Sequence, residues 1–126
     1  MPSSDDPFLR ILCVDDNAPL LRTLAVGFRK YGFEVVTASH GIDALMQFRA
    51  NAGNFATILT DQDMPKMDGS EFIQQVRALG YKGRVLVMSG RLSASAFQSY
   101  QDLEVSGFIS KPFDISMVAT MIMQAN

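Results

Sequence analysis

Short apolar segments alternate along the chain with longer segments of helical periodicity. Five apolar segments are predicted to be strands, namely residues 11–14, 35–38, 56–60, 85–88 and 108–109. Most of them are nearly continuous apolar runs, which is typical of strands that helices cover on both faces. The alternation therefore predicts an α/β domain with a mainly parallel sheet.

Start and stop signals mark the first helix. Asn17 is a favourable N-cap, and Pro19 falls in the first turn, where proline is tolerated. Gly32 supplies the residue type that most often ends a helix. The segment between them is predicted to be a helix with a broad apolar face formed by Leu20, Leu21, Leu24, Phe28 and Tyr31.

Two further helices are predicted from the same signals. The second begins near Ser39, and its apolar positions are Ile42, Leu45 and Met46. The third begins at Asp68, which has Glu71 at capping-box spacing, and it stops at Gly80. Its apolar positions are Phe72, Ile73, Val76 and Leu79.

The last two helices differ in how clearly they are patterned. Residues 93–101 carry serines and glutamines of lower helix propensity, so we expect the fourth helix to be the most mobile. The fifth helix follows Asp114, and its apolar positions suit a terminal helix docked on the sheet: Ile115, Val118, Ala119 and Ile122.

The composition fits one folded domain. The chain has 126 residues, of which 48% are hydrophobic and 19% are charged, and one core commonly organises about 100 to 150 residues. We expect a single domain over residues 8–126 and a flexible segment over residues 1–7. That segment lacks the apolar core of a signal peptide, and no later stretch is long enough to span a bilayer. A cytoplasmic protein without a membrane partner is therefore expected.

The charge balance and the single cysteine limit the function classes. A formal net charge of -2 gives no general attraction to nucleic acid or anionic membranes, so direct nucleic-acid binding is not expected. Cys13 is the only cysteine and lies within an apolar run. It cannot form an internal disulfide, and a buried thiol is expected there.

Polar residues with useful chemistry follow the predicted strands. Asp15 and Asp16 follow the first, Asp61 the third, Ser89 the fourth and Lys111 the fifth. Because the carboxyl ends of parallel strands meet at one edge of the sheet, where ligands usually bind, these residues are predicted to form one site.

The residue types at this site suit phosphoryl transfer. Three carboxylates at one edge repel each other, and Mg²⁺ would lower that cost because it prefers oxygen ligands. Asp61 could then act as a nucleophile toward phosphorus and form an acyl phosphate. Lys111 offers a cation and Ser89 a hydroxyl donor to phosphoryl oxygens.

Taken together, four motifs resemble those of response-regulator receiver domains of the chemotaxis-regulator type. They are Val14-Asp15-Asp16-Asn17, the run from Asp61 to Gly69, Met88-Ser89-Gly90 and Lys111-Pro112-Phe113. The motifs occur in the family's order and at similar separations, and the resemblance covers nearly the whole chain. It implies a flavodoxin-like, doubly wound (βα)5 fold with a five-stranded parallel sheet in the order 2-1-3-4-5.

The resemblance also implies roles for the site residues. Asp61 would receive a phosphoryl group from a phosphohistidine on a sensor histidine kinase or a histidine phosphotransfer protein. Asp16, Asp61 and the backbone carbonyl of Asp63 match the family's Mg²⁺ ligands, and Asp15 matches a position that usually contacts the metal through water. The chain would be a signalling phosphoacceptor and not an enzyme, catalysing only its own phosphorylation and dephosphorylation.

A conformational switch is implied by two further positions. Ser89 and Phe108 match the hydroxyl and aromatic residues whose rearrangement reports phosphorylation to the face formed by the fourth helix, fifth strand and fifth helix. A downstream protein, an output domain or a second copy of the chain would bind there. Phe108 stands where a tyrosine is possible, so its movement would depend on packing without a terminal hydrogen bond.

Two alternatives remain open from the sequence alone. Asp61 and Asp63 at a separation of two also occur in phosphohydrolases of the haloacid-dehalogenase type, although Asp15 and Asp16 argue against that assignment. A pseudo-receiver that acts only as an interaction module would keep the fold without the chemistry. Turnover of a phosphate ester would identify the first, and absence of an acyl phosphate would identify the second.

Two exposed positions carry further expectations. Asp63 and Arg91 follow Asp61 and Ser89 by the same interval, and they are predicted to form an ion pair across the mouth of the site that sets the acyl-phosphate lifetime. His40, the only histidine, precedes Gly41 and is expected to be a surface turn residue.

Overall fold

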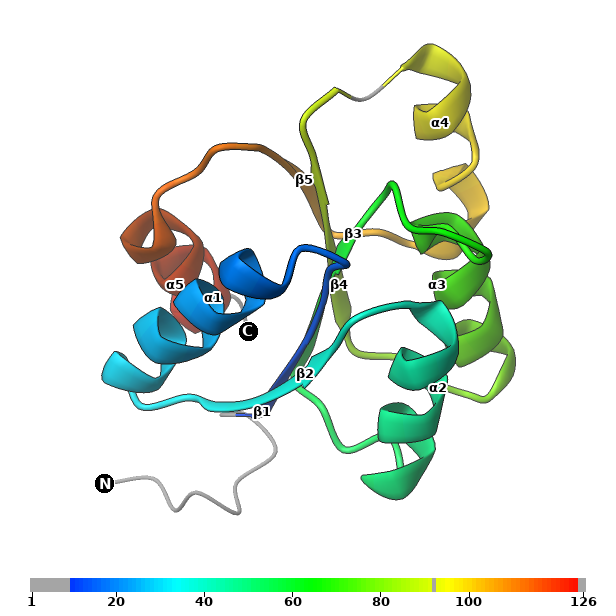
Figure 1. Cartoon of the computed structure of the whole chain (residues 1–126). Coiled ribbons are helices and arrows are strands. Elements are labelled where there is room, and N and C mark those ends of the chain that lie inside the picture. The colour runs from blue at the N-terminus through cyan, green and yellow to red at the C-terminus, as the bar shows by residue number, and fades with distance from the viewer. Residues whose placement is uncertain (1–9, 92, 125–126) are drawn as a thin grey trace.

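A central parallel sheet organises the chain (Figure 1). The computed structural model describes residues 10–91 and 93–124, so the flexible segment expected over residues 1–7 lies outside the described residues. The strands are β1 (Arg10–Val14), β2 (Glu34–Ala38), β3 (Thr57–Asp61), β4 (Arg84–Ser89) and β5 (Gly107–Ser110). All pairings are parallel, and the spatial order β2-β1-β3-β4-β5 confirms the predicted topology.

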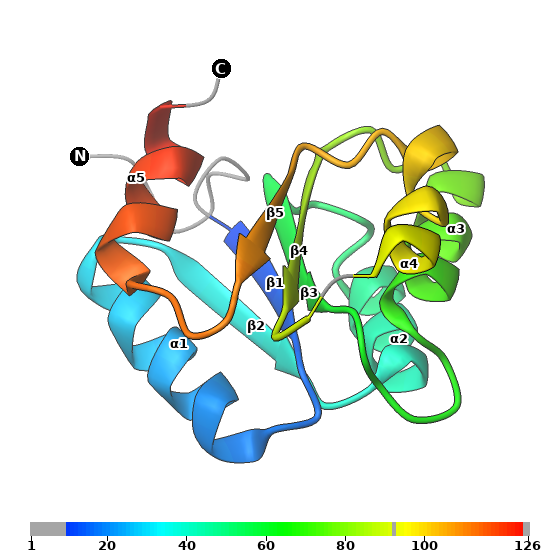
Figure 2. The ribbon, with the colours of Figure 1, turned by 90° about the horizontal axis from the view of Figure 1, so that it is seen from above.

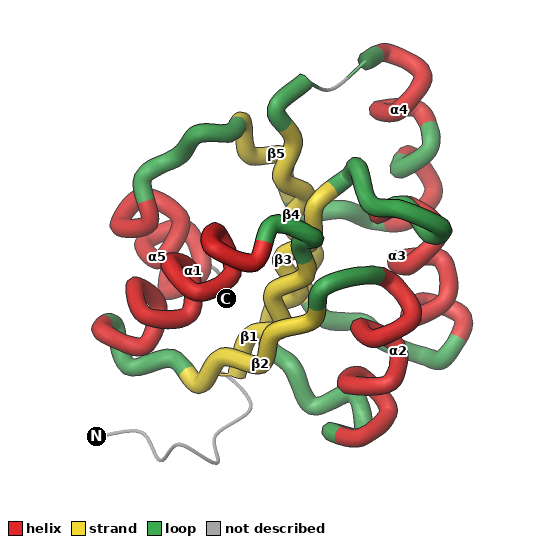
Figure 3. The backbone as a smooth tube through the Cα atoms, viewed as in Figure 1, coloured by secondary structure: helices red, strands yellow, loops and turns green. Residues whose placement is uncertain are grey.

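Helices cover both faces of this sheet, as the continuous apolar strands predicted (Figure 3). One face carries α1 (Ala18–Lys30) and α5 (Ile115–Gln124). The other carries α2 (Gly41–Ala50), α3 (Gly69–Ala78) and α4 (Ala94–Gln98), followed by a 3-10 turn over Gln101–Leu103. In the described residues no helix is long and apolar enough to cross a bilayer.

Each face of the sheet has its own apolar core. The α1/α5 core includes Ile11, Cys13, Leu24, Phe28, Leu59, Leu86, Val118 and Ile122. The core under α2, α3 and α4 includes Leu12, Val14, Phe48, Ile58, Phe72, Val76, Val87 and Tyr100. Successive strand residues enter opposite cores because side chains alternate along a strand. The same strands therefore join the two cores into one domain.

Local capping explains where the helices begin. The side chain of Asn17 accepts a hydrogen bond from the backbone N–H of Leu20, and that of Asp68 accepts one from the N–H of Glu71. These contacts satisfy helix N–H groups that have no partner within the helix. The predicted starts of α1 and α3 are thus confirmed.

The predicted apolar face of α2 is confirmed at Leu45 and wrong at its other two positions. Leu45 is partly buried against the core, but Ile42 and Met46 are 48% and 62% exposed, whereas Ala44 and Phe48 are buried. Phe48 lies edge-on to Tyr81, with ring centroids 5.5 Å apart, and this aromatic contact turns the Phe48 side of the helix toward the sheet.

Smaller differences occur at other element ends. Leu79, predicted on the buried face of the third helix, is the C-terminal cap of α3 and is 49% exposed. The predicted fourth helix over 93–101 is shorter in the structure, where α4 covers only Ala94–Gln98 and a separate 3-10 turn begins at Gln101. Its expected mobility stays a prediction.

Candidate functional site

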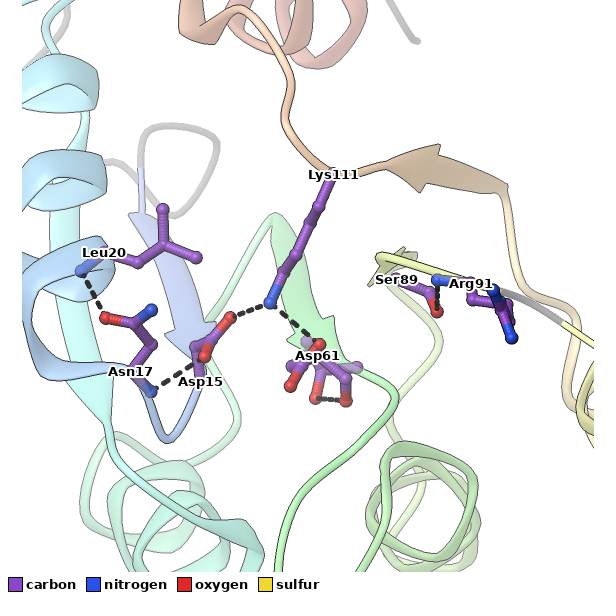
Figure 4. A network of polar contacts seen from close by, with 8 residues as sticks. Asp15, Asn17, Leu20, Asp61, Ser89, Arg91 and Lys111 are labelled. Carbon is purple, nitrogen blue, oxygen red and sulfur yellow. Dashed lines mark hydrogen bonds and ion pairs between the residues drawn. The ribbon is translucent and has the colours of Figure 1, made fainter.

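The carboxyl edge of the sheet brings the predicted residues together (Figure 4). Asp61 and Ser89 are the last residues of β3 and β4. Asp15 directly follows β1, and Lys111 directly follows β5. Seen from above, the loops that leave the strands start at this edge and turn toward the helices on the two sides of the sheet (Figure 2).

Lys111 joins two acidic side chains across the edge. Its Nζ lies 2.6 Å from Oδ2 of Asp15 and 3.0 Å from Oδ1 of Asp61. Its backbone N–H donates to the carbonyl oxygen of Ser89 at 2.9 Å, which fixes the start of the side chain beside β4. One cation thus compensates two neighbouring carboxylates at the mouth of the sheet.

Asp15 is fully buried, and its polar groups are engaged. Its Oδ1 accepts a hydrogen bond from the backbone N–H of Asn17 at 2.9 Å, while Oδ2 receives Lys111. Its own N–H donates to the carbonyl oxygen of Ala38 on β2. Because both carboxylate oxygens have donors, a direct metal bond at Asp15 would compete with existing contacts.

The acidic cluster suits a divalent cation. One carboxylate oxygen from each of Asp15, Asp16 and Asp61 lies within 4.8 Å of the others. Asp16 is exposed and Asp61 is nearly buried, so the cluster opens to solvent on the Asp16 side. Oxygen-rich, partly solvated sites of this kind fit Mg²⁺, which retains several waters.

Burial and neighbouring charges shift the titration of the central groups. Burial raises the pKa of Asp61, and Asp15 adds to that rise, although the hydrogen bond from Lys111 acts in the opposite direction. For Lys111, burial alone would lower the pKa, but the bonds to Asp15 and Asp61 outweigh it and the pKa is raised. Lys111 therefore stays a cation at neutral pH.

Ser89 and Phe108 lie beyond the acidic cluster on β4 and β5. Ser89 is buried, and its hydroxyl oxygen accepts a hydrogen bond from the backbone N–H of Arg91 at 3.1 Å. Phe108 is partly buried, with its ring centroid 4.7 Å from that of Phe97 on α4 and 5.6 Å from that of Tyr100. An aromatic cluster thus connects β5 to α4.

The predicted ion pair at the mouth of the site is wrong for this structure. The ion pairs among the described residues do not include Asp63 with Arg91, and both side chains are exposed. What Arg91 contributes is its backbone N–H, which holds Ser89. Both residues follow a strand by the same number of positions, which correctly predicts that they lie at one edge of the sheet. The sequence interval does not determine the direction in which their flexible side chains point.

Three contributors were missed by sequence reasoning. Tyr100 is 2% exposed and packs against Phe108. Thr60 donates its hydroxyl to the carbonyl oxygen of Asp61 at 3.1 Å. His40 caps α2, its Nδ1 accepting from the N–H of Asp43, and it is exposed as expected. Of these three roles, only the capping by His40 had a signal in the sequence, namely its position at the start of a predicted helix.

Comparison with known proteins gives one consistent result. The response regulator receiver domain model matches residues 11–123. The transcriptional regulatory protein PrrA of Mycobacterium tuberculosis is 31% identical over 113 residues, which are 90% of this chain and 48% of PrrA. The sensor histidine kinase RcsC of Escherichia coli K12 is 30% identical over 115 residues, which are 91% of this chain and 12% of RcsC.

Solved structures agree with the sequence comparisons. The chemotaxis protein CheY4 of Vibrio cholerae superposes with a TM-score of 0.84 at 25% identity, covering 93% of this chain and 98% of that one. A chain of the CheX-CheY-BeF3-Mg+2 complex from Borrelia burgdorferi gives a TM-score of 0.82 at 25% identity, covering 94% of this chain and 90% of that one.

The match extends over nearly all of the chain, but the chain spans only about half of PrrA and about an eighth of RcsC. The family model, the strand order and the acidic pocket argue against the haloacid-dehalogenase alternative. With the matched residues running from β1 into α5, the chain belongs to the response regulator receiver domains of two-component signalling.

Proposed function

We propose that Asp61 is the phosphoacceptor of this receiver domain. The observation that carries this proposal is the position of its carboxylate, buried at the sheet edge beside Lys111 and the other two acidic side chains. Lys111 engages Oδ1, and no described residue donates a hydrogen bond to Oδ2. Oδ2 is therefore the oxygen free to attack.

The reaction exchanges one bond to phosphorus for another. Oδ2 of Asp61 attacks the phosphorus of a phosphohistidine and the P–N bond breaks. The electron pair of that bond goes to the donor imidazole, which takes a proton from solvent and leaves as a neutral ring. Lys111 faces the phosphoryl oxygens, and Ser89 donates its hydroxyl to one of them. Later attack by water releases inorganic phosphate and restores the Asp61 carboxylate.

Mg²⁺ is the proposed cofactor. Asp16, Asp61 and the backbone carbonyl of Asp63 would hold it, and Asp15 would contact it through water, because both oxygens of Asp15 already accept hydrogen bonds. When bound, the ion supplies positive charge that offsets the phosphoryl oxygens. The burial of Asp15 beside the exposed Asp16 supports this division of roles.

The proposed partners follow from the same chemistry. A sensor histidine kinase or histidine phosphotransfer protein would supply the phosphoryl group. The switch pair Ser89 and Phe108 would change the α4-β5-α5 face, where a downstream protein, an output domain or a second copy of the chain would bind. The domain would act as a cytoplasmic phosphoacceptor whose only reactions are its own phosphorylation and dephosphorylation.

Intact-protein mass spectrometry tests this proposal. With Mg²⁺ and acetyl phosphate, the wild-type chain should gain one phosphoryl group, and Asp61→Asn should gain none. Asp63→Asn is the matched control, since it makes the same chemical change two residues away and keeps the backbone carbonyl. A wild-type chain that gains no adduct would point to a pseudo-receiver, and an adduct on Asp61→Asn would move the acceptor elsewhere.

A further inference from the structure

Two polar groups with opposite hydrogen-bonding needs are buried beside the phosphoacceptor. The hydroxyl of Tyr100 and the side-chain oxygen Oε1 of Gln62 have no hydrogen-bond partner among the described residues. Tyr100 is 2% exposed and Gln62 is 8% exposed, so bulk solvent does not satisfy them. Buried polar groups are nearly always paired, and an unpaired one in a native structure calls for a physical reason.

The chain places both groups on the same side of the sheet. Gln62 directly follows the last residue of β3, and alternation along the strand puts its side chain on the side of Ile58. Ile58 and Tyr100 belong to the same apolar core, under α2, α3 and α4.

Gly69 brings the two segments into contact. A Cβ on Gly69 would lie 2.7 Å from the Tyr100 hydroxyl oxygen and 3.2 Å from Cα of Gln62. The N–H of Gly69 also donates to the carbonyl oxygen of Gln62 at 3.0 Å. The hydroxyl therefore reaches the loop that joins Asp61 to α3, and the missing side chain of Gly69 makes room for it.

The chemistry of the two groups is complementary. Burial raises the pKa of the Tyr100 phenol, and the carboxylates of Asp68, Asp63 and Asp61 raise it further, so the hydroxyl keeps its proton and is a donor. The amide oxygen of Gln62 is an acceptor. The nearby Asp61 carbonyl already accepts from Thr60, which leaves the Gln62 oxygen as the acceptor in greater need of a donor.

The Tyr100 ring also connects this loop to the surface. It lies edge-on to Phe108, at 5.6 Å between centroids, and Phe108 packs against Phe97 at 4.7 Å. Phe97 is 48% exposed on α4. A change in the position of Tyr100 would therefore displace Phe108 and, through it, Phe97 on α4.

We propose that Tyr100 is a positioning residue whose hydroxyl donates a hydrogen bond to Gln62 when Asp61 is phosphorylated, coupling the site through Phe108 to Phe97. This inference rests on the proposed function. Gln62 lies between the phosphoacceptor and Asp63, whose carbonyl is the proposed metal ligand, so phosphorylation and metal binding both act on residues bonded directly to it. From the turn that follows α4, the hydroxyl supplies the polar contact that Phe108 cannot make.

Stability without any phosphodonor gives the first test. Tyr100→Phe removes an unpaired hydroxyl and keeps the ring, so its urea unfolding midpoint should equal or exceed that of wild type. Tyr81→Phe is the matched control, because the hydroxyl of Tyr81 donates to the carbonyls of Phe55 at 3.0 Å and Arg84 at 3.3 Å. Its midpoint should fall. A clear fall for Tyr100→Phe would show that its hydroxyl is already bonded and would overturn the proposal.

Beryllium fluoride with Mg²⁺, an analogue of the acyl phosphate, gives the second test. Tyr100→Phe and Gln62→Met should each bind it about fivefold more weakly than wild type, as expected for one hydrogen bond. The double variant should lose no more than either single variant, and Tyr81→Phe should bind normally. Wild-type affinity in Tyr100→Phe, or additive losses in the double variant, would refute the pairing.

Near-ultraviolet tyrosine absorption provides a direct signature, since the chain has 3 tyrosines and no tryptophan. Addition of beryllium fluoride should change this absorption in wild type and Tyr81→Phe, and the change should be lost in Gln62→Met, where Tyr100 remains but lacks its acceptor. Retention of the change in Gln62→Met would overturn the proposal. If wild type bound no analogue and gained no phosphoryl group, the proposed function would fail and this inference with it, whereas normal binding with unaffected variants would remove only the role of Tyr100.

Discussion

Asp61 is a carboxylate that folding places in an unfavourable position. The side chain is nearly buried, burial raises its pKa, and Lys111 only partly offsets that rise. A charged group that is poorly solvated in the folded chain lowers the free energy of unfolding. The same property suits a nucleophile, because an under-solvated oxygen gains more when it bonds to phosphorus.

A pH series of Asp61→Asn tests this cost. Because the pKa of Asp61 is higher in the folded chain than its ordinary value of 3.8, folding binds a proton between the two values. The contribution of Asp61 to the free energy of unfolding is therefore favourable at low pH, and it is lost as the pH rises through the pKa of Asp61 in the folded chain. Asparagine does not titrate, so Asp61→Asn should be more stable than wild type at neutral pH.

Urea unfolding in metal-free buffer would measure the difference. The advantage of Asp61→Asn should shrink as pH falls toward 3.8. Asp63→Asn, at an exposed position, should show no comparable trend. A stability difference that stays constant across the series would mean that ionisation of Asp61 is not its cause.

Asp15 and Asp16 are adjacent carboxylates with different surroundings, and they should differ in metal affinity. Asp16→Asn should weaken Mg²⁺ binding more than Asp15→Asn, because Asp15 already accepts from Asn17 and Lys111. Loss of an outer-sphere partner typically costs about 10- to 100-fold in affinity, and we expect loss of a direct ligand to cost more. Calorimetric Mg²⁺ titration of both variants is the measurement, and equal or reversed losses would contradict the division.

At the scale of single residues, the sequence predicted which residues lie at the site better than it predicted which side chains contact one another. Asp15, Asp61, Ser89 and Lys111 were predictable because parallel strands end at one edge, a rule that depends only on topology. The position of Tyr100 was not predictable, since it depends on a close approach to Gly69 from a turn that is distant in sequence. Long-range contacts of that kind leave no local pattern.

Among the elements, α2 shows how a tertiary contact overrides a sequence pattern. Ile42 and Met46 are apolar and four residues apart, yet both are exposed, while Ala44 and Phe48 face the core. The choice depends on the aromatic cluster in which Phe48 meets Phe55 and Tyr81. Periodicity predicted the helix correctly, but the buried stripe depended on partners elsewhere in the chain.

Truncations on the two faces of α2 should therefore have very different effects. Phe48→Ala should lower the free energy of unfolding by about 3 to 5 kcal/mol, because it leaves a cavity in a packed aromatic cluster. Met46→Ala should change it by less than about 0.5 kcal/mol, as is usual for exposed positions. Urea unfolding of both variants checks this; a larger loss for Met46→Ala would restore the face predicted from the sequence.

For the whole molecule, the question is whether two cores that share one sheet behave as one unit. Cys13 lies in the core under α1 and α5, while Tyr81 lies in the core on the other face. The two cores share the strands of one sheet, because β1 and β3 each contribute residues to both of them. A ligand at the carboxyl edge touches the ends of those strands, so it should stabilise both cores together.

Cys13 and the tyrosines provide built-in probes for this question. Burial raises the pKa of Cys13 to about 12, so the native thiol should react with a disulfide reagent only after unfolding. In a urea series, thiol reactivity and near-ultraviolet tyrosine absorption should therefore share one midpoint. Mg²⁺ at ten times its dissociation constant should raise the free energy of unfolding by about 1.4 kcal/mol for both probes, and Asp16→Asn should remove most of that gain. If Mg²⁺ shifted one probe and left the other unchanged, the two faces would unfold separately, and a signal at the site would not be shared by the whole domain.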